Sequence, residues 1–188
     1  MSLNISKKLK SNHKSKISIY MKNLLSKTIT LSFNDIGNNI TELITEKIID
    51  TFSGICIEEG FVKPNSINLV EYSAGQIRGN IVVFIVNFEC LICRPVPGLK
   101  FNCIVKNITK AGIRAEYIDN PSPVIVFIAK DHHYDMDEFS KINEGDIIRA
   151  RVIGIRFELN DKYISVIADF LSKNRKQNKK SNRLITKV

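Results

Sequence analysis

The hydrophobic and polar positions predict one helix near the start of the chain and strands over most of the rest. Branched and aromatic residues dominate 17–33, where apolar and polar positions alternate as in a strand. A helix is expected next, capped by Asn34 or Asp35 and ending near Phe52 before Gly54. Its apolar positions follow helical spacing and would form one face laid on a sheet: Ile36, Ile40, Leu43, Ile44 and Ile48.

Strand patterns continue after Gly54, at 61–62, 67–70 and 81–93. The last run is continuously apolar at first and alternates later, which predicts a strand buried on both faces that becomes half exposed. It ends at Arg94-Pro95-Val96-Pro97-Gly98, where two prolines in three residues cannot continue a ladder. A domain boundary is therefore expected at residue 98.

Beyond this boundary the chain shows short strand patterns separated by turn residues. The polar stretch 131–145 between the third and fourth strands has room for one short helix. A small closed barrel of the OB type is predicted, because closure removes exposed strand edges. The fold class is α+β. The expected strands are 100–108, 112–118, 123–128, 146–157 and 162–170.

The formal charge of +9 is unevenly distributed. Residues 1–16 contain five lysines and residues 172–188 contain seven basic residues, and neither segment has an acid, so residues 17–171 sum to −3. The tails would attract polyanions in a salt-dependent way, or serve only as solvated termini that aid solubility. The predicted organisation is a basic tail, two domains and a second basic tail: 1–16, 17–98, 99–171 and 172–188. No apolar run is long enough to span a membrane, and no secretory signal is evident.

Groups that suggest chemistry do not form a site. Cys90 and Cys93 have the spacing of a metal or redox pair, but residues three apart on a strand point to opposite faces. His132 and His133 lie among aspartates, where a charged loop is the simpler interpretation. The four cysteines are interpreted as reduced intracellular thiols. No catalytic residue, metal or cofactor, and no small-molecule substrate, is predicted.

Four collinear segments give the chain a family resemblance: Leu31–Gly37, Gly54–Gly60, Ser73–Ile77 and Phe88–Gly98. Over roughly residues 17–171 it resembles the larger stalk subunit of multisubunit DNA-dependent RNA polymerase, which is the seventh subunit of the eukaryotic enzymes and has an archaeal counterpart. The resemblance implies a truncated RNP-like strand–helix–sheet domain, then a five-stranded OB barrel of the ribosomal S-one type. It also implies a non-catalytic role in transcription, including its initiation.

The family's N-terminal domain docks a tip onto the polymerase core, formed by the largest subunits and the clamp, and pairs with a smaller stalk subunit as a heterodimer. The resemblance places that partner against strand 81–93 and the domain junction. Ile77 is the expected apolar anchor. Carried over by position, the docking residues are Asp35, Ile36, Gly37, Asn38, Gly75, Gln76, Ile77 and Arg78.

The resemblance of the barrel implies binding of single-stranded nascent RNA near the exit path, through aromatic stacking in a basic groove. The chain departs from the usual pattern: Ala111 and Arg114 occupy the two aromatic positions, Phe127 replaces a histidine, and Arg156 replaces an acid. Tyr117 is the candidate for a second ring. The predicted RNA contacts are Lys106, Lys110, Arg114, Tyr117, Phe127, Lys130, Arg149, Arg151, Arg156 and Lys162.

Two other interpretations stay open at this point. One is a free-standing OB-fold RNA-binding adaptor in translation or RNA decay, and the other is a nuclease, which would need carboxylates and a metal on one face. High isoleucine, lysine and asparagine usage suggests AT-rich coding, as in a large DNA virus or a divergent eukaryote. The expected location is intracellular: the nucleus for a cellular protein, the virion or a cytoplasmic viral factory for a viral one.

Overall fold

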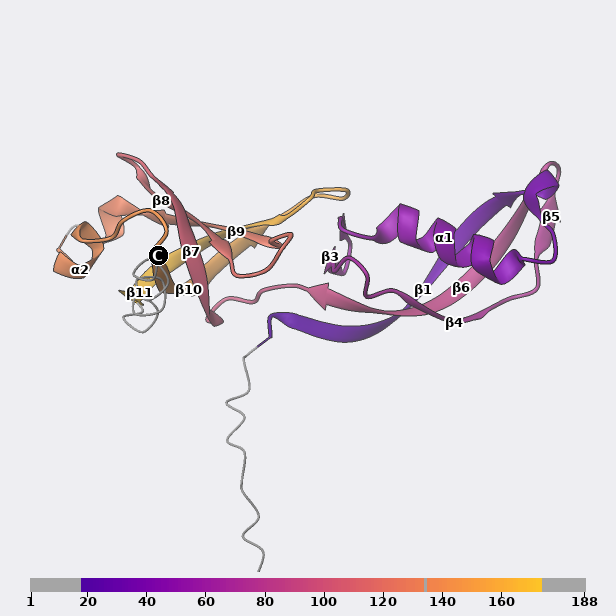
Figure 1. Cartoon of the computed structure of the whole chain (residues 1–188), viewed down its shortest axis with the longest axis horizontal. Coiled ribbons are helices and arrows are strands. Elements are labelled where there is room, and N and C mark those ends of the chain that lie inside the picture. Colours follow the sequence, from indigo (N-terminus) through magenta and orange to yellow (C-terminus); the bar gives the residue numbers. More distant parts are fainter. Residues whose placement is uncertain (1–17, 134, 174–188) are drawn as a thin grey trace, which may run out of the picture.

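The computed structural model describes residues 18–133 and 135–173, and Figure 1 shows an N-terminal domain at one end of the molecule and a barrel at the other. No helix among these residues is long and apolar enough to cross a membrane. The N-terminal elements are β1 (Tyr20–Ser32), η1 (Phe33–Asp35), α1 (Ile40–Phe52), β2 (Cys56–Ile57), β3 (Gly60–Val62), β4 (Asn68–Tyr72), β5 (Gln76–Arg78) and β6 (Ile81–Cys93). The later elements are β7 (Lys100–Ile108), β8 (Gly112–Tyr117), β9 (Val124–Ala129), η2 (Lys130–His132), α2 (Asp137–Ser140), β10 (Ile147–Arg156) and β11 (Ile164–Lys173).

The N-terminal domain is a sheet built around the long strand β6, with one helix on it. β1 pairs with β6 antiparallel over its whole length, and β3, β4 and β5 pair with successive parts of the opposite edge of β6. Helix α1 covers one face through Ile44 and Ile48, which are fully buried, and Phe52 stacks on Phe88 with ring centroids 5.6 Å apart. This confirms a core helix on a sheet.

Two details of this domain differ from the sequence expectation. β6 is not buried on both faces at its start: Ile85 is 50% exposed between buried Phe84 and Val86, because α1 covers only one side of the sheet. The helix begins at Ile40 with Asn39 as its N-cap, so the expected cap at Asn34 or Asp35 is wrong. Those earlier residues belong to the 3-10 turn η1, which carries the chain over the end of the sheet.

The second domain is the predicted five-stranded closed barrel, with strand order β10-β11-β9-β8-β7. β7 and β10 close it, and only the β9–β11 pair is parallel. Alternate residues of each strand point inward and are buried, as Val105, Ala115, Val126, Ile148 and Val166 show. The last strand extends two residues beyond the predicted domain end, and η2 and α2 occupy the polar stretch where one short helix was expected. The structure confirms the α+β fold class with an OB-like barrel.

The two domains meet in a shared apolar contact rather than through a bare linker. Ile19, Phe61 and Cys93 of the N-terminal domain belong to the hydrophobic cluster that fills the barrel. The loop between β10 and β11 also bonds to β2, since Asn160 N donates to Cys56 O (2.9 Å) and Cys56 N donates to Asp161 O (2.7 Å). The Pro-rich segment between β6 and β7 crosses this junction. Packing and backbone bonds therefore fix how the barrel is held on the first domain.

Candidate nucleic-acid and polymerase-docking surfaces

Phe127 is an exposed ring on the outer wall of the barrel. It lies in β9 with 43% of its surface exposed, while Val126 and Ile128 beside it are buried. Across the strands it is paired with Arg114 of β8 and Ile167 of β11. Partners opposite one another in a sheet share a face, so the guanidinium, the ring and the isoleucine lie in one row. A flat ring beside a guanidinium is a suitable platform for a nucleobase.

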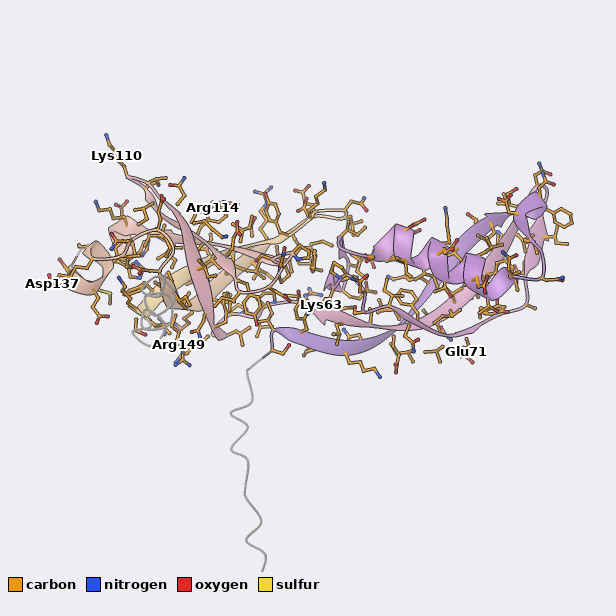
Figure 2. The ribbon with its side chains drawn as sticks, in the orientation of Figure 1. Lys63, Glu71, Lys110, Arg114, Asp137 and Arg149 are labelled. Atoms are coloured by element: carbon orange, nitrogen blue, oxygen red, sulfur yellow. The ribbon has the colours of Figure 1, made fainter. Side chains whose placement is uncertain are left out.

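Basic residues lie on the β7–β8 side of this ring. Lys106 and Arg114 both approach Glu116, at 3.6 and 3.4 Å, and remain partly exposed. Lys110 lies in the β7–β8 turn, and Lys130 N donates to Ala111 O of that turn (3.0 Å), which brings the two lysines to the same end of the barrel. Figure 2 shows Lys110 and Arg114 on the same side of the barrel. We call this surface the Phe127 patch: Lys106, Lys110, Arg114, Phe127 and Lys130.

The structure does not bring all the predicted RNA contacts to this patch. Arg149 and Arg151 point outward from β10 beside Asn102 and Lys100 of β7, and Figure 2 shows Arg149 on the opposite side of the barrel from Arg114. Arg151 is also held by Asp169, 2.6 Å away.

Arg156 and Lys162 belong to the β10–β11 hairpin and are exposed, and Arg156 pairs with Glu158 at 3.4 Å. Tyr117 is not a second ring of the patch. Its strand alternation places it with inward-facing Ile113 and Ala115, and it packs edge-on against Phe101 with centroids 5.7 Å apart. The ring therefore helps to fill the domain junction.

The predicted docking residues gather at the end of the N-terminal domain farthest from the barrel, where η1, β5 and the start of α1 lie together (Figure 1). Ile77 is 67% exposed. Phe33, which the sequence pattern assigned to a strand, is 50% exposed in η1, and its N–H donates to Asn80 O (3.0 Å). The remaining predicted contacts flank these two side chains: Asp35, Ile36, Gly37, Asn38, Gly75, Gln76 and Arg78.

Packing within the N-terminal domain requires glycine at position 75. A Cβ at this position would lie 2.6 Å from Val82 Cγ1 and 2.9 Å from the Phe84 ring. Gly37 has no such neighbour, since its nearest contact would be Asn39 Oδ1 at 3.4 Å. The absence of a side chain at 75 thus serves packing within the tip, whereas Gly37 has no such packing requirement.

The cysteines are buried thiols. Burial raises the pKa of Cys93 and of Cys103 to about 12, and that of Cys90 to about 11, so they stay protonated at neutral pH. Cys90 packs in the core under α1, whereas Cys93 packs in the barrel cluster, as expected for opposite faces of a strand. Within the described ranges, no group of three or more His, Cys, Asp or Glu residues is arranged to hold a metal ion.

A polar cluster lies at the domain junction. Lys63 Nζ is 3.1 Å from Asp119 Oδ2 and 4.5 Å from the centre of the Tyr20 ring. Burial opposes ionisation of Asp119, but the hydrogen bonds from Lys63 and the Asn120 amide, together with the charge of Lys63, outweigh it, so the pKa of this carboxyl lies below its ordinary value. Burial, reinforced by the Asp119 charge, raises the pKa of Tyr20 far above its ordinary value. This cluster joins the domains and is remote from the Phe127 patch.

Sequence reasoning missed two apolar neighbours of the Phe127 patch. Ile167 is 59% exposed beside Phe127, and Ile153 of β10, 49% exposed, lies near Ile167 where β10 pairs with β11. The outward position of Ile167 could have been predicted from strand alternation, because Val166 and Ala168 on either side of it are buried. Ile153 could not be found this way, since a register shift between Val152 and Gly154 interrupts the alternation.

Comparison with known proteins gives the family. No protein-family model matches the chain. A DNA-directed RNA polymerase subunit of Acanthamoeba polyphaga mimivirus is 31% identical over 172 residues, which cover 82% of this chain and 83% of the relative. The chain belongs to the RPB7-like family of RNA polymerase stalk subunits. Subunit 7 of RNA polymerase II from Arabidopsis thaliana is 25% identical, and subunit RPB7 from Glycine max is 24% identical, each over 172 residues with 78% of this chain and 95% of the relative covered.

Membership of this family confirms the resemblance that the four collinear segments carried. An RPB7-like protein is a non-catalytic subunit of a DNA-directed RNA polymerase and works in transcription as part of that complex. The family architecture also agrees with the two-part fold, an N-terminal strand–helix–sheet domain followed by an OB-like barrel.

Proposed function

We propose that the protein is a polymerase stalk subunit that docks by its N-terminal tip and holds nascent single-stranded RNA on the Phe127 patch. The two surfaces lie at opposite ends of the molecule (Figure 1). That separation lets one end bind the core enzyme while the other reaches toward the RNA exit path. The observation that supports RNA binding is the pairing of exposed Phe127 with Arg114 across β8 and β9.

RNA binding at this patch depends on local arrangement, because the barrel has no bulk positive charge. Residues 99–171 contain ten basic and eleven acidic side chains. The patch contains four basic residues and one exposed ring, and among the described residues the only acid that forms ion pairs with Lys106, Lys110, Arg114 or Lys130 is Glu116. Stacking on Phe127 is tolerant of base identity, so we expect weak binding with little sequence preference. Tethering to the polymerase raises the local RNA concentration and keeps such a weak site occupied.

Docking at the tip uses Ile77 and Phe33 as apolar anchors. Both are at least half exposed, on β5 and η1, with Asn38 and Arg78 available for polar contacts at the rim. Interfaces draw most of their binding energy from a few central side chains of this kind. The core enzyme, through its largest subunits and clamp, is the expected partner.

The smaller stalk subunit is expected on the uncovered face of the N-terminal sheet and at the domain junction. Ile81 and Ile85 of β6 are 42% and 50% exposed on the face opposite α1, and Leu24 of β1 is 64% exposed. Exposed apolar side chains of this kind on a sheet face are typical of a protein interface, although Ser26 and Asn87 separate Leu24 from the two isoleucines. A heterodimer partner that covers these apolar side chains would remove them from water.

The mimivirus relative supports a polymerase role over a free-standing RNA-binding adaptor, because its name assigns it to a polymerase. It also supports the viral alternative for the origin of this chain. The proposed location is inside the cell, in a viral factory or virion for a viral enzyme and in the nucleus for a cellular one.

A reciprocal pair of variants tests both halves of the proposal. Phe127→Ala should weaken single-stranded RNA binding by about 1–3 kcal/mol, the usual contribution of a stacked base, and leave co-purification with the large polymerase subunits at high salt unchanged. Phe33→Ala removes an equally exposed ring at the other end. It should weaken co-purification and leave RNA binding unchanged. Loss of RNA binding in both variants, or in neither, would contradict the assignment of the two surfaces.

A further inference from the structure

β4 is an edge strand with one free side. It pairs with β6 from Asn68 to Tyr72, and within residues 18–133 and 135–173 no strand pairs with its other edge. A free edge presents backbone N–H and C=O groups that can bond to an added strand. The register shift between Leu69 and Glu71 bends the strand and leaves Val70 53% exposed.

A groove of about 490 Å³ lies between this strand and α1. Helix α1 points Ile44 and Ile48 into the core, and its flank carries Thr41 and Thr45 toward β4. Thr41 Oγ1 and Tyr72 Oη are hydrogen-bonded at 3.1 Å across the groove. The side chains that line it are mainly apolar or hydroxyl-bearing: Thr41, Thr45, Ile67, Leu69, Val70 and Tyr72.

The surroundings of the groove are acidic. Glu71 lines it, and its carboxylate accepts a hydrogen bond from Asn87 Nδ2 (2.8 Å). Glu42 and Glu46 follow on exposed positions of α1. None of these three carboxylates forms an ion pair with a lysine or arginine of the described chain. Figure 2 shows Glu71 at the margin of the N-terminal domain, away from the basic side chains labelled on the barrel.

We propose that this groove binds an extended basic segment of a partner polypeptide, which adds to β4 as a further strand. An edge strand beside a helix is the arrangement in which strand addition gives both main-chain bonds and side-chain pockets. Side chains of the added segment that point to the α1 side would pack on Ile67 and Leu69, and the intervening basic ones, on the other side of the sheet, would face Glu71. RNA is excluded as the occupant because the carboxylates repel phosphate. The groove adjoins the tip at Thr41 but does not include Ile77 or Phe33, and it is separate from the Phe127 patch.

A peptide selection with the full-length protein tests the occupant directly. A displayed library of random 12-residue peptides should yield sequences with several lysines or arginines alternating with apolar residues. The selected peptide, labelled with fluorescein, is then titrated by anisotropy. Binding should weaken with salt, and backbone amide shifts on binding should concentrate at residues 68–72.

Two threonines of α1 provide a matched pair of variants. Thr45 and Thr51 both donate their hydroxyl to the carbonyl four residues earlier, at 2.7 and 2.6 Å, but only Thr45 lines the groove. Thr45→Trp should fill the groove and reduce peptide affinity at least tenfold, whereas Thr51→Trp should leave it within twofold. If Thr45→Trp does not fold, Glu71→Lys against Asp50→Lys gives the same comparison by charge.

Several results would overturn the proposal. Selected peptides that are acidic, helical or absent would exclude a basic added strand. So would affinity that is equal in Thr45→Trp and Thr51→Trp, or in the two charge reversals. A concentration-dependent dimer abolished by Thr45→Trp would identify a second copy of the chain as the occupant. Peptide binding that appears only after removal of residues 1–17 would identify the chain's own N-terminal segment as the occupant of the groove.

Discussion

Lys63 Nζ of the N-terminal domain lies 3.1 Å from Asp119 Oδ2 of the barrel. Both side chains are only partly exposed, at 36% and 27%. The contact lies beside Tyr20 and the shared apolar cluster around Phe61. It therefore fixes the orientation between the docking end and the RNA end through a charge pair.

A double-mutant cycle measures this bridge. Lys63→Met and Asp119→Asn should each lower the free energy of unfolding, and their coupling should be about 0.5–1 kcal/mol, the range for a partly exposed pair. Urea unfolding of the two single variants and the double variant provides the measurement. Additive losses would show that the two groups do not interact in solution.

Two carboxyl groups are expected to make the protein less stable at acidic pH. Lys63 lowers the pKa of Asp119 against the opposing effect of burial, and Lys173 does the same for Asp146. Because both pKa values are lower in the folded state, the stabilisation is present above the ordinary value of 3.8 and is lost as the pH falls through the folded values. Unfolding measured from pH 6 to pH 2 should show this loss. Asp119→Asn should make the slope shallower, and an unchanged slope would contradict the assignment.

His133 is expected to be the more critical of two adjacent histidines. Its Nε2 accepts a hydrogen bond from Phe170 N (3.0 Å), its Nδ1 lies 2.9 Å from Ala129 O, and its ring stacks on Phe139. His133→Phe would leave the buried Phe170 N–H without an acceptor and should cost about 1–3 kcal/mol. His132→Phe is the control, because His132 is exposed. Equal stability of the two variants in thermal unfolding would refute this role.

Two barrel glycines should respond differently to alanine. Gly112 has φ +151°, and a Cβ there would clash with the carbonyl oxygen of Ile128, whereas a Cβ at Gly154 would meet nothing within 4 Å. Gly112→Ala should therefore destabilise the barrel by about 2 kcal/mol, since backbone must move or stay strained. Gly154→Ala should change stability little. Chemical denaturation of both variants decides the matter, and a similar loss in each would count against the β8–β9 packing described.

Strand parity and turn residues were sufficient to predict the barrel. The turns around Lys110, Asn120 and Asn160 and the polar stretch 131–145 separate the five strands, and alternation distinguishes inward Val126 from outward Phe127. The start of α1 could not be predicted, because the bond from Phe33 N to Asn80 O joins residues far apart in the chain. That bond converts the expected cap region into a 3-10 turn.

The composition of the candidate sites was harder to predict than the fold. Parity puts Arg149 and Arg151 on one face of β10, but only barrel closure shows that this face is turned away from Phe127. Tyr117 was predicted as a stacking ring from its aromatic character, although its alternation with Ile113 and Ala115 indicates the inward face. The groove beside β4 depends on how α1 crosses the sheet, which no local pattern encodes.

The most direct test of the central claim is photo-crosslinking within the transcribing polymerase. A photoreactive phenylalanine analogue at position 127 should crosslink to the nascent transcript once the RNA is long enough to leave the exit path. The same analogue at exposed position 149, on the opposite side of the barrel, serves as the control. We predict RNA crosslinks from 127 and few from 149. Crosslinks from 149 alone, or to protein only from both positions, would contradict RNA binding at the Phe127 patch.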